Sequence, residues 1–210
     1  MRNTNGKTYK MVMTAMLSAI VIMMAFTPLG YLKAGVIEIS FLMIPVAIGA
    51  VACGKPVGTI LGLLFGITSF IQCFGMSALG VFFMSVNPLF CFIICVVARL
   101  FAGMIADGTA KLTKPLGIPG FAITGLAAAL ANTVLFVGSV ILFFWNNDAF
   151  IGKMAEFGIS TENVFLFVAA FAGVNALIEA VVTAVITGAV GAALDKSGLL
   201  RKYDSVKAAE

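Results

Sequence analysis

Glu179 is the only charged residue between Val164 and Leu194, an apolar run long enough to cross a bilayer. Asn175 precedes it by one helical turn, so both side chains lie on one face of a helix. An ionisable group at membrane depth costs roughly 2.5–3.5 kcal/mol on insertion scales, and it usually faces a bundle interior or a wet cavity. The pair therefore indicates a buried polar site that can bind a solute or carry a proton.

Three more amide side chains, Gln72, Asn87 and Asn132, lie within or at the ends of other apolar runs. Asn132 falls near mid-depth of its run, so it converges with Asn175 and Glu179 if the two helices are neighbours. Together these groups would donate hydrogen bonds to a small polar solute and accept them from it. The alternative role for each residue is an interhelical hydrogen bond that holds the bundle together.

Two cationic residues, Lys33 and Arg99, are placed where they could interact with this site. Lys33, in the outer loop 28–36 with Tyr31, is a candidate partner for a substrate carboxylate, and the loop can cap a pocket. Arg99 lies towards the inner end of the fourth apolar run. There it either pairs with Glu179 or extends its long side chain to the inner membrane surface.

Motifs for catalysis and cofactor binding are absent from the sequence. There is no Walker sequence, nucleophile elbow, dinucleotide glycine motif or histidine, so we expect no bound cofactor. The four cysteines, at 53, 73, 91 and 95, lie in or beside apolar runs, where cysteine is usually a packing residue, and we predict no metal site. An intramembrane enzyme using Glu179 and Asn175 is disfavoured because no second carboxylate lies nearby.

The elements that position these residues are helices in a membrane. Hydrophobic residues make up 61% of the 210 residues and charged residues only 10%, which excludes a soluble domain. Breaks at proline, glycine and charged clusters predict an all-α polytopic protein, 1–210, with one six-helix domain and a tail at 196–210. The predicted helices span residues 9–28, 36–53, 57–72, 81–106, 119–145 and 164–195.

The distribution of basic residues predicts the orientation. Six crossings put both termini on one side, and only Lys33 and Lys153 fall on the opposite side. By the positive-inside rule the termini are cytoplasmic and the protein is multi-pass in the cell membrane. The net charge of +4 then anchors the inner leaflet and does not indicate nucleic-acid binding. The residues on the predicted cytoplasmic side are Arg2, Lys7, Lys10, Lys55, Lys111, Lys114, Lys196, Arg201, Lys202 and Lys207.

Small residues recur every four positions in several of these segments, and such ladders let helix backbones approach closely in lipid. Two ladders predict tight packing within the bundle, whereas Ala15 and Ala19 lie on the first segment, where a partner helix can dock. The two packing ladders are Gly54, Gly58, Gly62 and Gly66, and Ala172, Ala176, Ala180, Ala184, Gly188 and Ala192.

Several of these runs resemble the S component, the substrate-binding membrane subunit, of an energy-coupling factor (ECF) vitamin transporter. They include Thr27-Pro-Leu-Gly, Gly62-Leu-Leu-Phe-Gly-Ile-Thr-Ser, Ala131-Asn-Thr-Val and Asn175-Ala-Leu-Ile-Glu-Ala, and the chain is most similar to the pantothenate type. The resemblance implies capture of a vitamin from outside, and association with a transmembrane coupling (T) subunit and two cytosolic ATPases that use ATP. Ala15 and Ala19 match the family's Ala-x-x-x-Ala docking motif. The run from Gln72 to Gly80 departs from the expected Asn- and Thr-rich loop, which leaves other vitamins or precursors open.

Two classes of function therefore compete. The first is a non-enzymatic vitamin-binding subunit with Asn132, Asn175, Asn87, Gln72 and Lys33 as candidate contacts. The second is a stand-alone secondary transporter in which Glu179 carries a coupling proton. No inverted repeat is visible in the sequence, which disfavours the second class.

Overall fold

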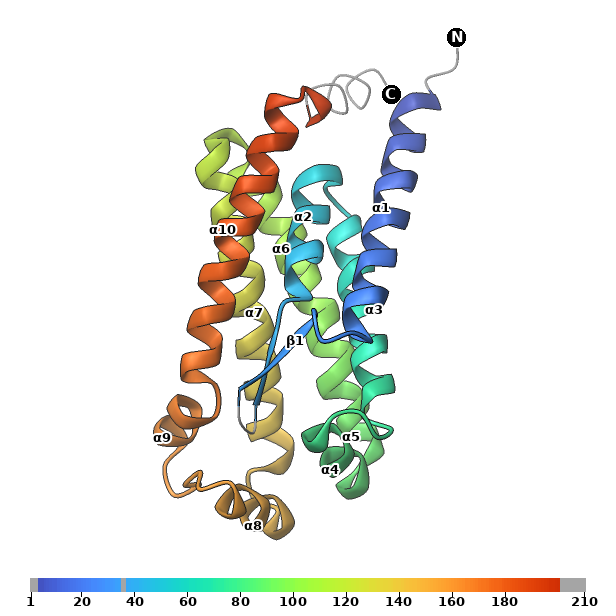
Figure 1. The fold of residues 1–210 in the computed structure, drawn as a ribbon. Helices are drawn as coiled ribbons and strands as arrows, with labels where there is room; N and C mark the ends of the chain where they lie inside the picture. The colour runs from blue at the N-terminus through green and yellow to red at the C-terminus, as the bar shows by residue number, and fades with distance from the viewer. Residues whose placement is uncertain (1–3, 35–36, 201–210) are drawn as a thin grey trace.

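The computed structural model describes residues 4–34 and 37–200 as a bundle of helices with one short hairpin (Figure 1). Arg2 and most of the predicted tail, 201–210, lie outside the described residues. In chain order the elements are α1 (Thr4–Ala25), β1 (Tyr31–Ala34), β2 (Ile37–Ser40), α2 (Met43–Cys53), α3 (Val57–Gln72), α4 (Ala78–Val86), α5 (Pro88–Phe92), η1 (Ile93–Val97), α6 (Ala98–Thr113), η2 (Lys114–Leu116), α7 (Ile118–Phe144), α8 (Asp148–Glu156), α9 (Val164–Val168), η3 (Ala169–Gly173) and α10 (Val174–Lys196).

Four helical stretches of the described residues are long and apolar enough to cross a bilayer. They are Gly6–Ala25, Pro88–Leu116, Ile118–Phe144 and Val164–Lys196, while α2 and α3 are apolar but shorter. Large apolar side chains such as Leu142 and Phe165 are exposed on the outside of the bundle, as expected of lipid-facing helices. The predicted class, a helical membrane protein, is confirmed. Six crossings and cytoplasmic termini stay predictions.

The prediction of a helix over 36–53 is wrong at its start, where the chain forms a short strand, Ile37–Ser40. β1 and β2 pair antiparallel, with Tyr31 opposite Ser40, and α2 begins only at Met43. The run Ile37-Glu-Ile-Ser alternates apolar and polar residues with two β-branched side chains, a pattern that favours a strand over a helix.

The predicted fourth helix, 81–106, is two helices. Pro88 favours an extended conformation in the residue before it, and Asn87 adopts φ −157° and ψ 107°. The Asn87 side chain then caps α5 by accepting hydrogen bonds from the amides of Leu89 (3.0 Å) and Phe90 (3.2 Å). A new helix runs from Pro88 to Leu116, and α4 is a separate short helix before it.

The bundle has two ends of different character (Figure 1). The start of α1, the turn between α2 and α3, the turn before α7 and the end of α10 lie at one end. The basic residues Lys7, Lys55, Lys111, Lys114 and Lys196 lie on these segments. The short helices α4, α8 and α9 lie at the other end, over a second apolar core rich in phenylalanine. α7 packs between α6 and α10 through the length of the bundle.

The glycine ladder of α3 is tightly packed within the bundle, as predicted, and its neighbour is the helix 88–116. A Cβ atom on Gly62 would lie 2.6 Å from the Arg99 carbonyl oxygen, and one on Gly66 would lie 2.8 Å from the Val96 Cα. Gly54 is different, because it ends α2 with φ +62° and has open space around it. The ladder on α10 packs in part against α7, where a Cβ on Gly188 would lie 3.2 Å from the Ala122 Cβ.

Asp107, a buried residue of α6, binds the first turn of α3. Its Oδ1 accepts from the Gly58 amide (2.9 Å), and its Oδ2 accepts from the Thr59 amide (2.9 Å) and hydroxyl (2.7 Å). The first amides of a helix have no partners within that helix, and the positive end of the helix dipole favours a carboxylate there. Asp107 therefore fixes one end of α3 against α6.

Replacing Asp107 with alanine should lower the free energy of unfolding by about 3 kcal/mol, because it leaves buried amides without an acceptor. Thr59→Val removes only the hydroxyl bond and should cost about 1 kcal/mol. Thermal unfolding of the two variants in the same detergent measures the difference. Equal losses would show that the carboxylate does not hold the helix end.

Candidate ligand-binding cavity

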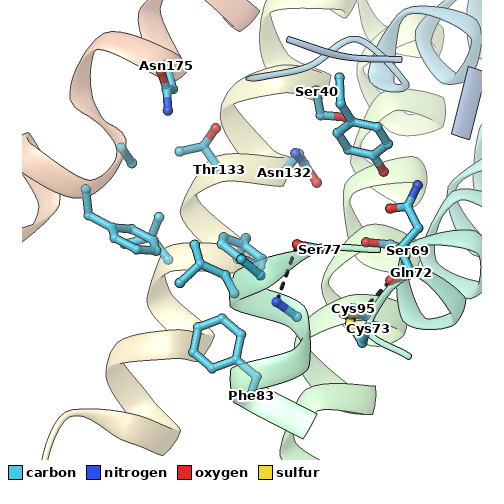
Figure 2. Close-up of a pocket in the computed structure, with 18 of the residues that line it drawn as sticks. Ser40, Ser69, Gln72, Cys73, Ser77, Phe83, Cys95, Asn132, Thr133 and Asn175 are labelled. Atoms are coloured by element: carbon cyan, nitrogen blue, oxygen red, sulfur yellow. Dashed lines mark hydrogen bonds between the residues drawn. The ribbon is translucent and has the colours of Figure 1, made fainter. Parts of the chain in front are cut away.

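A cavity of about 580 Å³ lies in the half of the bundle that contains α4, and it is of the size that holds small-molecule ligands (Figure 2). Its walls come from the end of α3, the turn and helix α4 that follow, η1 with the start of α6, the middle of α7, and η3 with the start of α10. Tyr31 and Ser40 of the hairpin also line it, so the segment after α1 contributes to the cavity wall.

Four of the predicted site residues line this cavity together: Gln72, Asn132, Asn175 and Glu179. Figure 2 shows Gln72, Asn132 and Asn175 on three different walls. Asn87 is not among the lining residues, because its side chain caps α5. Lys33 belongs to β1, and its side chain lies outside the part of the chain that the structure describes.

Asn132 and Glu179 form a hydrogen-bonded pair across the interface of α7 and α10. The Asn132 Nδ2 donates to the Glu179 Oε1 over 3.2 Å, and the two residues are only 5% and 6% exposed. Because the Glu179 oxygen accepts this bond, the amide nitrogen of Asn132 points towards Glu179. The Asn132 Oδ1 is consequently left buried without a partner, as an acceptor at the cavity wall.

Arg99 lines the same cavity and is only 8% exposed, so the prediction that it extends to the membrane surface is wrong. Its Nη1 donates to the carbonyl oxygens of Ile94 (3.0 Å) and Cys95 (3.3 Å). The guanidinium lies over the Phe65 and Phe136 rings, 4.9 and 5.1 Å from their centroids. Its Nε is buried and has no partner, which leaves a charged donor unsatisfied.

Sequence reasoning missed Arg99 as a site residue because it placed the residue near the end of a helix over 81–106. The break at Asn87 moves the helix to 88–116, and Arg99 then falls in its interior. Within the described residues Arg99 and Glu179 line one cavity without forming an ion pair, so direct pairing of the two is not observed. The Asn-Pro dipeptide was the signal that could have located Arg99 correctly.

Gln72 joins the cavity to α1. Its Nε2 donates to the Ala25 carbonyl oxygen at the end of α1, so the side chain is held in place at the cavity wall.

Both π-helical turns of the described chain also contribute lining residues, Cys95 from η1 and Phe171 and Ala172 from η3. Such turns are frequent at functional sites, because they change the direction in which side chains point.

The chemistry of this cavity suits reversible binding of a polar solute. It offers a cationic donor, an unpartnered amide oxygen and further amide and hydroxyl groups, with Phe83, Phe136 and Phe171 providing apolar surface. Buried polar groups without partners cost free energy, and a ligand that pairs with them recovers that cost.

The comparison with curated proteins gives no match. A family model described as "ECF transporter, substrate-specific component" matches residues 9–191, which is most of the chain and includes all of the cavity. The chain therefore belongs to the family of substrate-specific components of ECF transporters.

Proposed function

We propose that this substrate-specific component captures a water-soluble vitamin that carries a carboxylate, with pantothenate as the first candidate. The observation that carries the proposal is the pair of unpartnered groups in one cavity, the Arg99 Nε and the Asn132 Oδ1. A carboxylate would pair with the guanidinium, and a hydroxyl or amide of the same ligand would donate to Asn132. Pantothenate contains all three groups.

The remaining lining residues have supporting roles in this proposal. Glu179 is a positioning residue, because its hydrogen bond fixes the orientation of the Asn132 amide. Asn175 on α10 and Gln72 on α3 provide polar contacts from two other walls. Lys33 is a second cation on the hairpin that covers the cavity and is retained as a contact for the carboxylate.

Transport in this proposal depends on other subunits. The family implies that the chain works with a T subunit and ATPases; it is a transporter component and not an enzyme. We propose two cytosolic ATPases as the users of ATP, with no organic cofactor bound by this chain. The basic end of the bundle would face the cytoplasm, which puts the cavity in the outer half of the cell membrane, where it can collect a solute from outside.

Ala15 and Ala19 are exposed on α1, as a docking face requires. Replacing both with leucine should reduce co-purification of the T subunit and ATPases severalfold, because the larger side chains hold the partner helix away. The isolated variant should bind the vitamin as the natural chain does. Ala189 and Ala193, also exposed and one turn apart on α10, give a matched control pair, and an equal loss with that pair would contradict the assignment.

The function is tested by mass spectrometry of small molecules that co-purify with the detergent-solubilised chain, followed by a binding titration. We expect a stoichiometric carboxylate-bearing vitamin, bound by the natural chain and by Asn146→Ala but weakened in Asn132→Ala. Asn146 is exposed and outside the cavity, so it is a matched control. A chain that retains nothing and binds no member of a vitamin panel, pantothenate included, would overturn the proposal.

A stand-alone proton-coupled transporter is the second candidate, because Glu179 is a buried carboxyl group in the cavity wall. This function predicts uptake that survives loss of the ATPases and collapses with the proton gradient. The proposed function predicts the reverse, so uptake measured in cells with and without the ATPases separates the two.

A further inference from the structure

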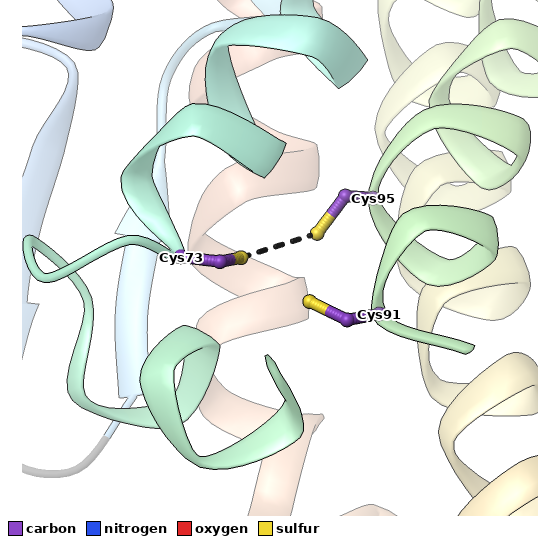
Figure 3. A group of neighbouring side chains, drawn as sticks. All are labelled: Cys73, Cys91 and Cys95. Atoms are coloured by element: carbon purple, nitrogen blue, oxygen red, sulfur yellow. Dashed lines mark hydrogen bonds between the residues drawn. The ribbon is translucent and has the colours of Figure 1, made fainter. Parts of the chain in front are cut away.

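Three cysteine sulfurs meet at the edge of the cavity. Cys73 follows the last turn of α3, Cys91 lies in α5 and Cys95 lies in η1, and Figure 3 shows the three side chains pointing towards one another. Their Sγ atoms all lie within 4.8 Å of one another, and those of Cys73 and Cys95 are 3.6 Å apart. All three residues are buried.

The fold brings these thiols together by two close approaches. Cys91 and Cys95 are four residues apart in one continuous helix, so they share a face. Gly66 lets α3 approach that helix closely, and this contact carries Cys73 to the same face. Gly80 of α4 closes the group from a third side, since a Cβ there would lie 2.8 Å from the Cys73 Sγ.

We propose that Cys73, Cys91 and Cys95 form a binding site for a soft divalent metal ion of the zinc class. Zinc–thiolate bonds of about 2.3 Å in tetrahedral geometry place two sulfurs about 3.8 Å apart. The sulfurs of Cys73 and Cys95 are 3.6 Å apart, and no two of the three sulfurs are more than 4.8 Å apart. These distances are close to the separation that a tetrahedral zinc ion requires, so small side-chain rotations would complete the site. Each thiol loses its proton on binding, and three protons pass to solvent for each ion bound.

The charge of the surroundings suits a divalent ion. Three thiolates with one divalent cation leave a net charge of −1, which is costly to bury alone. Arg99 is also buried, lies one helical turn beyond Cys95 and donates to the Cys95 carbonyl oxygen. Its positive charge offsets that of the metal–thiolate group.

The fourth coordination position would face the cavity. Cys73 and Cys95 line the cavity, whereas Cys91 lies behind them and does not. Metal sites with three protein ligands keep the fourth position for water or a substrate atom. A bound ion would therefore present an exchangeable position to any solute in the cavity. The sequence predicted no metal site, because Cys73 lies in a different helix from the other two and no ligand spacing reveals the contact.

The site is tested with the full-length chain in detergent, with its thiols reduced and metals removed, by titration with Cd²⁺. We expect one Cd²⁺ per chain and ultraviolet thiolate-to-metal absorption. Cys73→Ser, Cys91→Ser and Cys95→Ser should each lose this absorption. Cys53→Ser is the matched control and should retain it, because Cys53 is buried in α2 outside the group.

X-ray absorption of the Cd²⁺-loaded natural chain counts the sulfur ligands without any variant, so the test does not depend on the variants folding. Three sulfur ligands support the proposal, and two or fewer overturn it. A fully reduced natural chain that binds no Cd²⁺, or a Cys53→Ser variant that loses the absorption like the others, also overturns it. Vitamin binding and Cd²⁺ binding are measured separately, so failure of the proposed function and failure of the metal site can be told apart.

Discussion

Replacing Arg99 with glutamine should weaken vitamin binding by about 100-fold, which corresponds to about 3 kcal/mol. The Arg99 guanidinium donates to two carbonyl oxygens and lies over two aromatic rings, and its buried Nε has no hydrogen-bond partner. Glutamine removes the charge that a ligand carboxylate needs, and the carboxylate is then desolvated without a counter-ion. Isothermal titration of the purified variant with the co-purified vitamin measures the loss.

Two further variants make this prediction specific. Arg99→Lys keeps the charge and should recover part of the affinity, although it cannot reproduce the planar donor geometry. Lys153→Gln removes a half-exposed cation in α8 that pairs with Glu156 at the same end of the bundle, and it should leave the affinity unchanged. An equal effect of Lys153→Gln would show that the overall charge of this end, and not Arg99, determines affinity.

Gly62→Ala should lower the free energy of unfolding by about 3 kcal/mol, the upper range for overpacking. The added methyl group would meet the Arg99 carbonyl oxygen at 2.6 Å and the Gly103 Cα at 3.0 Å, and both are backbone atoms that cannot rotate away. The helices must separate to accept it. Because Arg99 lies at the contact, the same substitution should also weaken vitamin binding.

Gly108 provides the matched control for this substitution. It lies in α6, is exposed and has open space where a Cβ would be placed. Gly108→Ala should therefore stabilise the protein by roughly 0.5–1 kcal/mol, because alanine is the better helix former. Thermal unfolding in one detergent compares the two variants, and a shift of the same sign for both would contradict the close approach at Gly62.

The sequence predicted those features that depend on residue spacing along one helix. The four-residue repeat of small residues predicted the close contact of α3, and the isolated Glu179 with Asn175 predicted a polar cavity wall. What it did not predict depends on where helices break and on contacts between distant segments. The capping role of Asn87, the interior position of Arg99 and the bond from Asp107 to α3 follow from where helices break and which neighbours they meet.

The hairpin shows a different limit. Its strands are only four residues long, and an apolar run that continues into α2 masks their alternating pattern. The antiparallel pairing of the two strands, with Tyr31 opposite Ser40, distinguishes them from the start of a helix more clearly than this short pattern does. Both of these residues face the cavity, so the segment that sequence reasoning described least well contributes directly to the binding site.

The hydrogen bond from Gln72 to the end of α1 links two surfaces that lie far apart in the sequence. One is the cavity wall, and the other is the exposed face of α1 with Ala15 and Ala19. If docking of a partner on α1 shifts this bond, docking changes the affinity for the vitamin. The bound vitamin must then change the affinity for the partner by the same factor, because coupling between two binding sites is reciprocal. A loaded subunit and an empty subunit would then compete unequally for the same partner.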